Sequence, residues 1–325
     1  MKQRVLILGA TGFISRRIVN ALAKTDWATP VAASRRIITG LSTSLIETIP
    51  LDATDETALT KALAGVTSVV NCVAGDADTI VLGAKMLFSA AGRMASAPRI
   101  VHMSSLAAYG SVTGAIDEST PLLGDLDAYS KAKATTEQLG QTYPNLVTLR
   151  PGIVYGPESP WWSDRIARLL CARRLGDLGD VGNGFCNLVH VDDVVTAAIE
   201  AVRRPGIEGQ AFNLSCPTPP TWNEYFAMYG KALGVNPIAK ISRLRLAYEL
   251  KLLAIPLKAI EVTATKLKRP DWHPTPPLRP WLVTLCQHEI QLRVHKAENL
   301  LGLHWTPLPQ GLQQTAAWFL AGGRT

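Results

Sequence analysis

The sequence predicts an α/β protein, with a Rossmann-type doubly wound parallel sheet and a smaller, mostly helical C-terminal lobe. Short apolar runs alternate with helical patterns through the first half of the 325-residue chain. Such alternation is typical of parallel strands joined by right-handed helical crossovers. A glycine-rich turn directly follows the first apolar run, and the pattern loosens after Pro151, where Pro and Gly accumulate.

The expected elements follow from hydrophobic periodicity and from turn residues. We expect strands over residues 5–8, 31–33, 66–72, 100–103 and 146–149. We expect helices near 13–25, 55–64, 79–95, 128–142 and 161–174, and another from residue 192.

Composition and charge indicate which class of ligand the protein binds. The chain carries 33 basic and 26 acidic residues, a formal charge of +7, and 47% of its residues are hydrophobic. This is an ordinary globular composition, and a basic balance suits anionic partners. Because no long Lys/Arg run occurs, we expect a small-molecule substrate or anionic ligand and no nucleic acid.

Cysteine usage and the N-terminus indicate a cytoplasmic location. The five cysteines form no C-x-x-C pair and are odd in number, so we expect neither a disulfide framework nor a metal site. The apolar run at residues 5–8 is too short for a signal peptide and is interpreted as a buried strand. No apolar stretch reaches about 18 residues, so no membrane span is predicted.

The glycine-rich turn after the first strand predicts a dinucleotide site. Glycine lets backbone N–H groups approach a pyrophosphate, and the following helix N-terminus adds partial positive charge. The residues expected at this part of the site are Gly9, Thr11, Gly12, Phe13 and Ile14. Residues 1–150, with returning segments near 188–215, are predicted to form an NAD(P)-binding Rossmann domain. Residues 151–187 and 216–325 are predicted to form a substrate-binding lobe.

The end of the second strand favours NADP, with NAD as the alternative. An NAD enzyme usually places Asp or Glu here to bind the ribose hydroxyls. This chain has Ser34 followed by Arg35 and Arg36, and guanidinium groups suit the 2′-phosphate of NADP. A solvated basic loop is the competing interpretation. Asp52 is expected near the adenine.

A Ser, a Tyr and a Lys form the candidate catalytic set. Tyr129 and Lys133 are four residues apart, so they share one face of a helix. We expect the lysine to lower the pKa of the phenol and make it a workable proton donor or acceptor. Ser105 follows the strand at 100–103 and is expected at the carboxyl edge of the sheet, where ligands bind.

Five sequence segments, in order, resemble the extended short-chain dehydrogenases/reductases of the NAD-dependent epimerase/dehydratase family. The segments are Gly9-Ala-Thr-Gly-Phe-Ile, Met103-Ser-Ser-Leu-Ala-Ala-Tyr-Gly110, Tyr129-Ser-Lys-Ala-Lys133, Leu149-Arg-Pro-Gly-Ile-Val-Tyr-Gly-Pro157 and Val189-His-Val-Asp-Asp193.

The resemblance implies a role for each matching residue. It implies that Tyr129 is the general acid/base, that Lys133 binds the nicotinamide ribose, and that Ser105 orients and polarises the substrate oxygen. It places the segment from Pro151 to Val154, with Ile153, beside the nicotinamide. It also implies a homodimer built through helices of the fourth and fifth βα units.

One departure from the family pattern bears on the substrate. Nucleotide-sugar members usually carry an Arg shortly before the segment that starts at Val189, where it grips the diphosphate. The matching stretch here, residues 183–188, has no Arg, and a buried diphosphate without a cation is costly. A hydrophobic hydroxyl or carbonyl substrate is favoured, with aromatic pocket candidates Tyr155, Trp161, Trp162, Phe185 and Trp222.

Three functional hypotheses remain at this point. The leading one is an NADP-dependent reductase or dehydrogenase acting on a hydrophobic hydroxyl/carbonyl substrate. The second is a nucleotide-sugar epimerase or dehydratase that uses NAD as a catalytic shuttle. The third is a non-catalytic NADP-binding sensor or scaffold.

Residues 243–269 form a basic amphipathic segment whose role stays open. Leucines recur among arginines and lysines, a pattern compatible with peripheral contact with a membrane. A lid, a dimer face or a core-packed helix are the alternatives.

Overall fold

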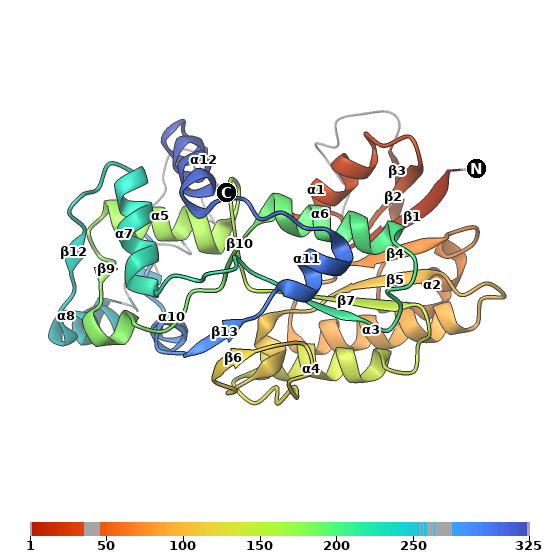
Figure 1. The fold of residues 1–325 in the computed structure, drawn as a ribbon, viewed down its shortest axis with the longest axis horizontal. Helices are drawn as coiled ribbons and strands as arrows, with labels where there is room; N and C mark the ends of the chain where they lie inside the picture. The colour runs from red at the N-terminus through yellow and green to blue at the C-terminus, as the bar shows by residue number, and fades with distance from the viewer. Residues whose placement is uncertain are drawn as a thin grey trace.

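A seven-stranded parallel sheet forms the centre of the molecule in the computed structural model, which describes residues 2–35, 46–253, 255, 257–258, 263 and 275–323 (Figure 1). The strand order is β11-β7-β5-β4-β1-β2-β3, and every adjacent pair is parallel. The strands are β1 (Gln3–Leu8), β2 (Ala28–Ser34), β3 (Glu47–Pro50), β4 (Ser68–Asn71), β5 (Arg99–Met103), β7 (Leu146–Pro151) and β11 (Ala211–Leu214). This order reverses between β1 and β4, which confirms the predicted doubly wound fold.

Helices cover both faces of the sheet. One face packs on α1 (Phe13–Leu22), α6 (Val191–Arg203) and α11 (His295–Leu301). The other lies against α2 (Glu56–Ala62), α3 (Ala77–Gly92) and α4 (Ala128–Gly140) (Figure 1). Strand side chains alternate between the two cores: Val5 and Ile7 face the first, Leu6 and Leu8 the second. A strand apolar on both sides has to be buried on both sides, which explains the continuous apolar runs in the sequence.

A smaller and mostly helical region lies beyond the carboxyl ends of the strands, on the left in Figure 1. Its core is aromatic and includes the fully buried Trp222, Tyr225, Phe226 and Tyr229 of α7. Its helices are η2 (Pro160–Asp164), α5 (Arg165–Cys171), η3 (Gly179–Gly182), α7 (Trp222–Ala232), α8 (Arg243–Tyr248), η4 (Glu249–Leu253), α10 (Pro280–Cys286) and α12 (Leu308–Leu320).

Three two-stranded parallel ladders link distant parts of the chain. They pair β8 (Ile153–Tyr155) with β10 (Leu188–His190), β9 (Gly176–Asp177) with β12 (Ala239–Lys240), and β6 (Gly114–Ile116) with β13 (Ile290–Leu292). The segment 188–215 therefore contributes one strand, β11, to the main sheet and one, β10, to a separate ladder. A short 3-10 turn, η1 (Leu106–Tyr109), follows β5.

The expected elements differ from the structure mainly at strands. β3 was not expected, because it is a short edge strand, mostly exposed, that ends on Pro50, and such a segment carries little hydrophobic signal. The helices match within a few residues. Two predicted pocket aromatics are wrong: Tyr155 and Trp222 are buried in the core and are 2% and 0% exposed. No helix in the described part of the chain combines the length and apolar character needed to cross a bilayer.

Candidate active site

The candidate site lies along the carboxyl edge of the main sheet, where the predicted residues come together. Gly9 directly follows β1 and Arg35 directly follows β2, whereas Asp52 and Ser105 lie two residues after the ends of β3 and β5. Pro151 ends β7, between β5 and β11. Because all these strands are parallel, their ends share one edge, as expected for a ligand site in this kind of sheet.

The turn after β1 requires glycine at its first position. Gly9 has a φ of +72°, and a Cβ there would lie 2.8 Å from the carbonyl oxygen of Cys72. Gly12 N–H closes the turn on Gly9 O at 3.0 Å. The buried Ser15 hydroxyl also donates to Gly9 O, at 2.6 Å. Ser15 stands at the third position of the dinucleotide-binding pattern, where a small residue allows close packing of helix and strand. Its hydrogen bond connects the turn to α1.

The N-terminus of α1 fits a bound pyrophosphate. No side chain caps this helix, whose N-cap is Gly12. By contrast, aspartate side chains cap α2, α3 and α4 through Asp55, Asp76 and Asp127. An aspartate before α1 would occupy the first-turn N–H groups and repel an anion. Backbone N–H groups that no described side chain caps, in a turn whose first position requires glycine, are what a phosphate needs. Thr11, Phe13 and Ile14 line this turn at partly or fully exposed positions.

The end of β2 carries positive charge beside two carboxylates. Arg35 is exposed, and its charge lowers the pKa of both Asp52 and Asp76, although hydrogen bonds from Thr54 and Thr79 are the larger causes. The hydroxyls of Thr11 and Ser34 lie 3.5 Å apart. An NAD-type acid is absent from position 34, where the chain has Ser34. Arg36, the second arginine of the prediction, lies outside the described residues.

Ser105 and Tyr129 face each other from neighbouring elements. Ser105 is the N-cap of η1, where its hydroxyl accepts from Ala107 N–H at 3.2 Å. Tyr129 lies in the first turn of α4, which Asp127 caps by accepting from Ser130 N–H at 2.7 Å. The Ser130 hydroxyl donates to Ala107 O at 2.7 Å and so ties the start of α4 to η1. The Ser105 hydroxyl is close enough to the Tyr129 hydroxyl to lower the pKa of that phenol.

Lys133 is a buried cation on the same helix, one turn further on. It is 5% exposed, and its ammonium donates to Met103 O at 2.8 Å and lies 5.7 Å from the centre of the Tyr129 ring. Burial lowers the pKa of Lys133 to about 8, against the opposing effects of Cys72 and Glu137. The lysine is therefore close to the point at which it can exchange a proton near neutral pH.

The predicted effect of Lys133 on Tyr129 is wrong for this structure. The pKa of Tyr129 is raised, because desolvation outweighs the effect of the Ser105 hydroxyl, and Asp127 raises it further. The residue is 43% exposed, so the desolvation concerns its hydroxyl and not the whole ring. The Lys133 ammonium is committed to a backbone carbonyl and acts on the ring, so it does not stabilise the phenolate.

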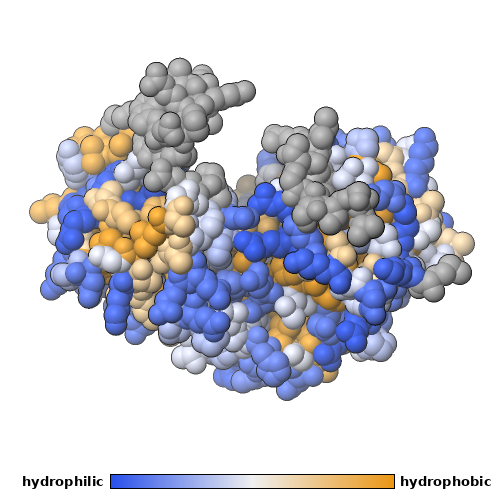
Figure 2. All heavy atoms as spheres, turned by 90° about the horizontal axis from the view of Figure 1, so that it is seen from above, coloured by the Kyte–Doolittle hydropathy of each residue, from blue (hydrophilic) through white to orange (hydrophobic). Residues whose placement is uncertain are grey.

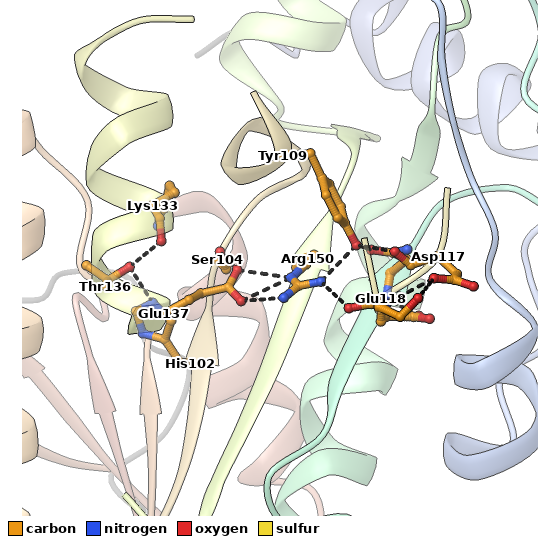
Figure 3. A network of polar contacts seen from close by, with 11 residues as sticks. His102, Ser104, Tyr109, Asp117, Glu118, Lys133, Thr136, Glu137 and Arg150 are labelled. Carbon is orange, nitrogen blue, oxygen red and sulfur yellow. Dashed lines mark hydrogen bonds and ion pairs between the residues drawn. The ribbon is translucent and has the colours of Figure 1, made fainter. Parts of the chain in front are cut away.

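A buried polar network behind Lys133 was not predicted (Figure 3). Glu137, one further turn along α4, pairs with Arg150 of β7 at 2.7 Å, and their side chains are 8% and 7% exposed. The Ser104 hydroxyl also donates to Glu137. Arg150 donates onward to the Tyr109 hydroxyl and to Glu118 O, at 2.8 and 3.2 Å. The network therefore connects α4 with the ends of β5 and β7.

A second branch holds the middle of α4. His102 contacts the Asn71 amide at 3.2 Å. It also contacts the Thr136 hydroxyl at 3.0 Å, and that hydroxyl donates to Lys133 O (Figure 3). Burial lowers the pKa of His102 to about 3, so the ring is neutral. One signal could have found this network: Glu137 lies four residues after Lys133, so helical spacing directs both side chains to the same face.

The remaining predicted residues lie at the end of β7 and beyond it. Pro151 and Ile153 are buried on either side of Gly152. Residues 183–188 include no cationic side chain. The Asn187 side chain donates to Ile290 O and accepts from Leu292 N–H, so it holds β13 in place and is not free to bind a substrate. Within the described ranges, no group of three or more His, Cys, Asp or Glu side chains is arranged to hold a metal ion.

The chain belongs to the NAD dependent epimerase/dehydratase family, whose model matches residues 5–215. This membership confirms the resemblance noted in the sequence, and it makes the chain an NAD(P)-dependent enzyme of the short-chain dehydrogenase/reductase type. No protein with a curated functional description matches the sequence.

Solved structures share the fold over nearly the whole chain. UDP-glucose 4-epimerase from Thermotoga maritima is 18% identical, with a TM-score of 0.72 over 98% of this chain and 99% of that one. UDP-glucuronic acid 4-epimerase from Bacillus cereus, in complex with NAD, is 19% identical, with a TM-score of 0.74 over 99% and 100%. A putative epimerase from Burkholderia cenocepacia is 17% identical, with a TM-score of 0.75 over 98% of each chain. At these identities the likeness shows the fold alone.

Proposed function

We propose that the chain catalyses hydride transfer at a carbon bearing a hydroxyl or carbonyl, with Ser105, Tyr129 and Lys133 as catalytic residues. The observation that carries this proposal is the meeting of the three groups at the carboxyl edge of the sheet: the Ser105 hydroxyl acts on the Tyr129 hydroxyl, and the Lys133 ammonium lies 5.7 Å from the centre of the Tyr129 ring. A nicotinamide dinucleotide, when bound, would supply the hydride chemistry.

The protein residues supply position and protons. The Ser105 hydroxyl would hold the substrate oxygen, as donors placed at a developing charge do. The raised pKa of Tyr129 keeps its phenol protonated at neutral pH, so it is ready to donate a proton to a carbonyl oxygen. Lys133 would bind the nicotinamide ribose, and the Gly9–Gly12 turn, Phe13 and Ile14 would hold the pyrophosphate. Arg35 and Asp52 would lie by the adenosine, with Pro151 and Ile153 beside the nicotinamide.

The comparisons favour a catalytic shuttle as the overall reaction. The family is that of epimerases and dehydratases, and the reported structures are epimerases. A retained NAD would supply reversible hydride chemistry at the substrate carbon, with no net change in the cofactor. We therefore rank a nucleotide-sugar epimerase or dehydratase first. Residues 183–188 oppose this choice of substrate, since they lack a cation for a diphosphate.

A net reductase that uses NADPH is the second candidate. It is supported by Arg35 at the end of β2, where a ribose-binding acid is missing and a 2′-phosphate would meet a guanidinium. Its substrate would be a hydrophobic ketone or alcohol.

One pair of measurements separates the candidates. A shuttle enzyme is expected to retain NAD(H) through purification and to interconvert sugar nucleotides without net change in NADH absorbance. A reductase is expected to consume NADPH with a panel of ketones. Absence of any NAD(H) or NADPH binding by fluorescence would refute both.

Replacing Tyr129 tests the catalytic assignment. Tyr129→Phe is expected to lower turnover about 10²–10⁴-fold while dinucleotide binding persists, since only proton transfer is removed. Tyr248→Phe, at another half-exposed tyrosine, is the matched control and should keep full turnover. Equal turnover in both variants would favour a non-catalytic sensor or scaffold.

We also propose the division of labour, assembly and location of the protein. Residues 1–150 and 188–215 would bind the dinucleotide, and residues 151–187 and 216–325 the substrate. A homodimer would form through α3 and α4, where Leu82 is 44% exposed. A cytoplasmic location is supported by the five free cysteines, which suit a reducing compartment.

A further inference from the structure

An exposed apolar stripe runs along α8 and η4, at the end of the molecule farthest from β3 (Figure 1). Leu244 is 85% exposed, Tyr248 50%, Leu252 63% and the helical Ile255 77%. Leu244 and Tyr248 are four residues apart in α8 and so share one side of that helix, and Leu252 and Ile255 continue the row of exposed apolar residues along the chain. Figure 2 shows apolar side chains gathered at this same end of the molecule.

The opposite side of the same segment is already packed on the protein. Leu246 and Glu249 are 7% and 3% exposed. Arg174 pairs with Glu249 and donates to Pro276 O at 3.2 Å, and Arg245 donates to Arg173 O at 2.6 Å. These contacts of the inner face fix the segment on the protein. The stripe lies on the opposite face and is exposed to solvent. Large apolar side chains grouped on a surface mark an interaction site.

Cations border the stripe. Arg243, Lys251 and Lys258 are exposed. Glu249 is the only acidic residue in the sequence from 240 to 258, and its charge is met by Arg174. The contact of Arg243 with Asp180 at 3.3 Å is between side chains that are 82% and 87% exposed, so it is weak and easily exchanged.

We propose that this stripe docks the protein peripherally on a membrane surface rich in anionic phospholipid. Apolar side chains would enter the boundary of the acyl chains while the flanking cations meet the headgroups, which is how interfacial helices bind. Charge decides against a second copy as the occupant: two copies meeting stripe to stripe would bring cationic borders together. The proposal is independent of the catalytic function.

Vesicle co-sedimentation tests this docking. Wild-type protein is expected to bind phosphatidylcholine vesicles that contain phosphatidylglycerol, to bind much less without it, and to dissociate as salt rises. Leu244→Ser with Leu252→Ser, and separately Arg243→Gln with Lys251→Gln, are each expected to weaken binding about tenfold. Leu300→Ser with Leu320→Ser, at exposed leucines of α11 and α12, is the matched control and should bind like wild type.

Three results would overturn the proposal. One is wild-type protein that stays in the supernatant with anionic vesicles at low salt. Another is equal loss of binding in the stripe variant and in the control variant. The third is a stripe variant that changes the oligomeric state in sedimentation velocity, which would assign the stripe to a second copy. Unchanged thermal unfolding of each variant shows that loss of binding is not loss of fold.

Discussion

Two buried arginine–glutamate pairs hold two different regions of this molecule. Glu137–Arg150 lies between α4 and β7 behind the candidate active site, with side chains 8% and 7% exposed. Glu249–Arg174 lies beneath the apolar stripe of α8 and η4, with side chains 4% and 13% exposed. The first pair is shared with Ser104 and Tyr109, whereas the second, among the described residues, adds the carbonyl of Pro276.

The two ion pairs differ in the part of the molecule that each one holds in position. A buried ion pair is weak evidence of stability, because desolvation offsets much of its attraction, but losing one partner is costly. In the first region the pair connects the helix that carries Tyr129 and Lys133 to the sheet, so its geometry reaches the reacting groups. In the second it fastens one surface segment. We therefore expect loss of the first to affect catalysis and loss of the second to affect surface binding.

The largest expected effect on stability is from Glu137→Gln. The substitution leaves Arg150 buried without a counter-charge, so the free energy of unfolding should fall by about 3–5 kcal/mol. Turnover should fall as well, since α4 loses its attachment to β7. Urea unfolding and steady-state kinetics on the same preparation measure both.

The double variant Glu137→Leu with Arg150→Met separates stability from position. Replacing both charges by apolar side chains should recover most of the unfolding free energy. Turnover is expected to stay low. Full recovery of turnover would mean that the pair serves stability only.

An intermediate effect on the free energy of unfolding is expected from Lys133→Met. Lys133 is a buried cation on the same helix, and its ammonium donates to the backbone carbonyl of Met103. The folded-state pKa, about 8, lies below the reference value of 10.5, so the unfolded chain binds more protons between these pH values and stability rises with pH across them. Below pH 8 the variant should be more stable by about 2 kcal/mol, after allowance for the lost bond to Met103 O. Turnover should be largely lost.

This advantage should shrink as pH rises from about 8 to 10.5 and vanish above it. Urea unfolding at pH 7 and at pH 10.5 is the measurement. A gap of equal size at both pH values would show that the lysine is not held with a depressed pKa.

The smallest expected effect is from Glu249→Gln. Arg174 is partly exposed and can be hydrated, so the free energy of unfolding should fall by only about 1–2 kcal/mol. Dinucleotide binding and turnover should be unchanged, because the described contacts of this pair lie away from α4. A loss of turnover as large as that of Glu137→Gln would contradict the expectation that only the first ion pair affects catalysis.

Much of the fold and part of the site could be predicted from local pattern. Continuous apolar runs and the helical periods between them indicated the doubly wound sheet, since each strand is buried on both faces. The Gly9–Gly12 turn and the spacing of Tyr129 and Lys133 are likewise local features, because a turn conformation and one helical turn involve only neighbouring residues. The edge strand β3 escaped prediction for the opposite reason: little of it is buried.

Other properties depend on contacts between distant segments, and only the tertiary structure decided them. The partner of Glu137 lies on another element, and the direction of the pKa shift of Tyr129 follows from the desolvation of its hydroxyl in the folded chain. Trp222 and Tyr155 became core residues because α7 and β8 pack inward. The sequence by itself determined the class of fold, the glycine turn and which residue types were available. Burial and long-range pairing decided what those residues do, because desolvation and ion pairing exist only once the chain has folded.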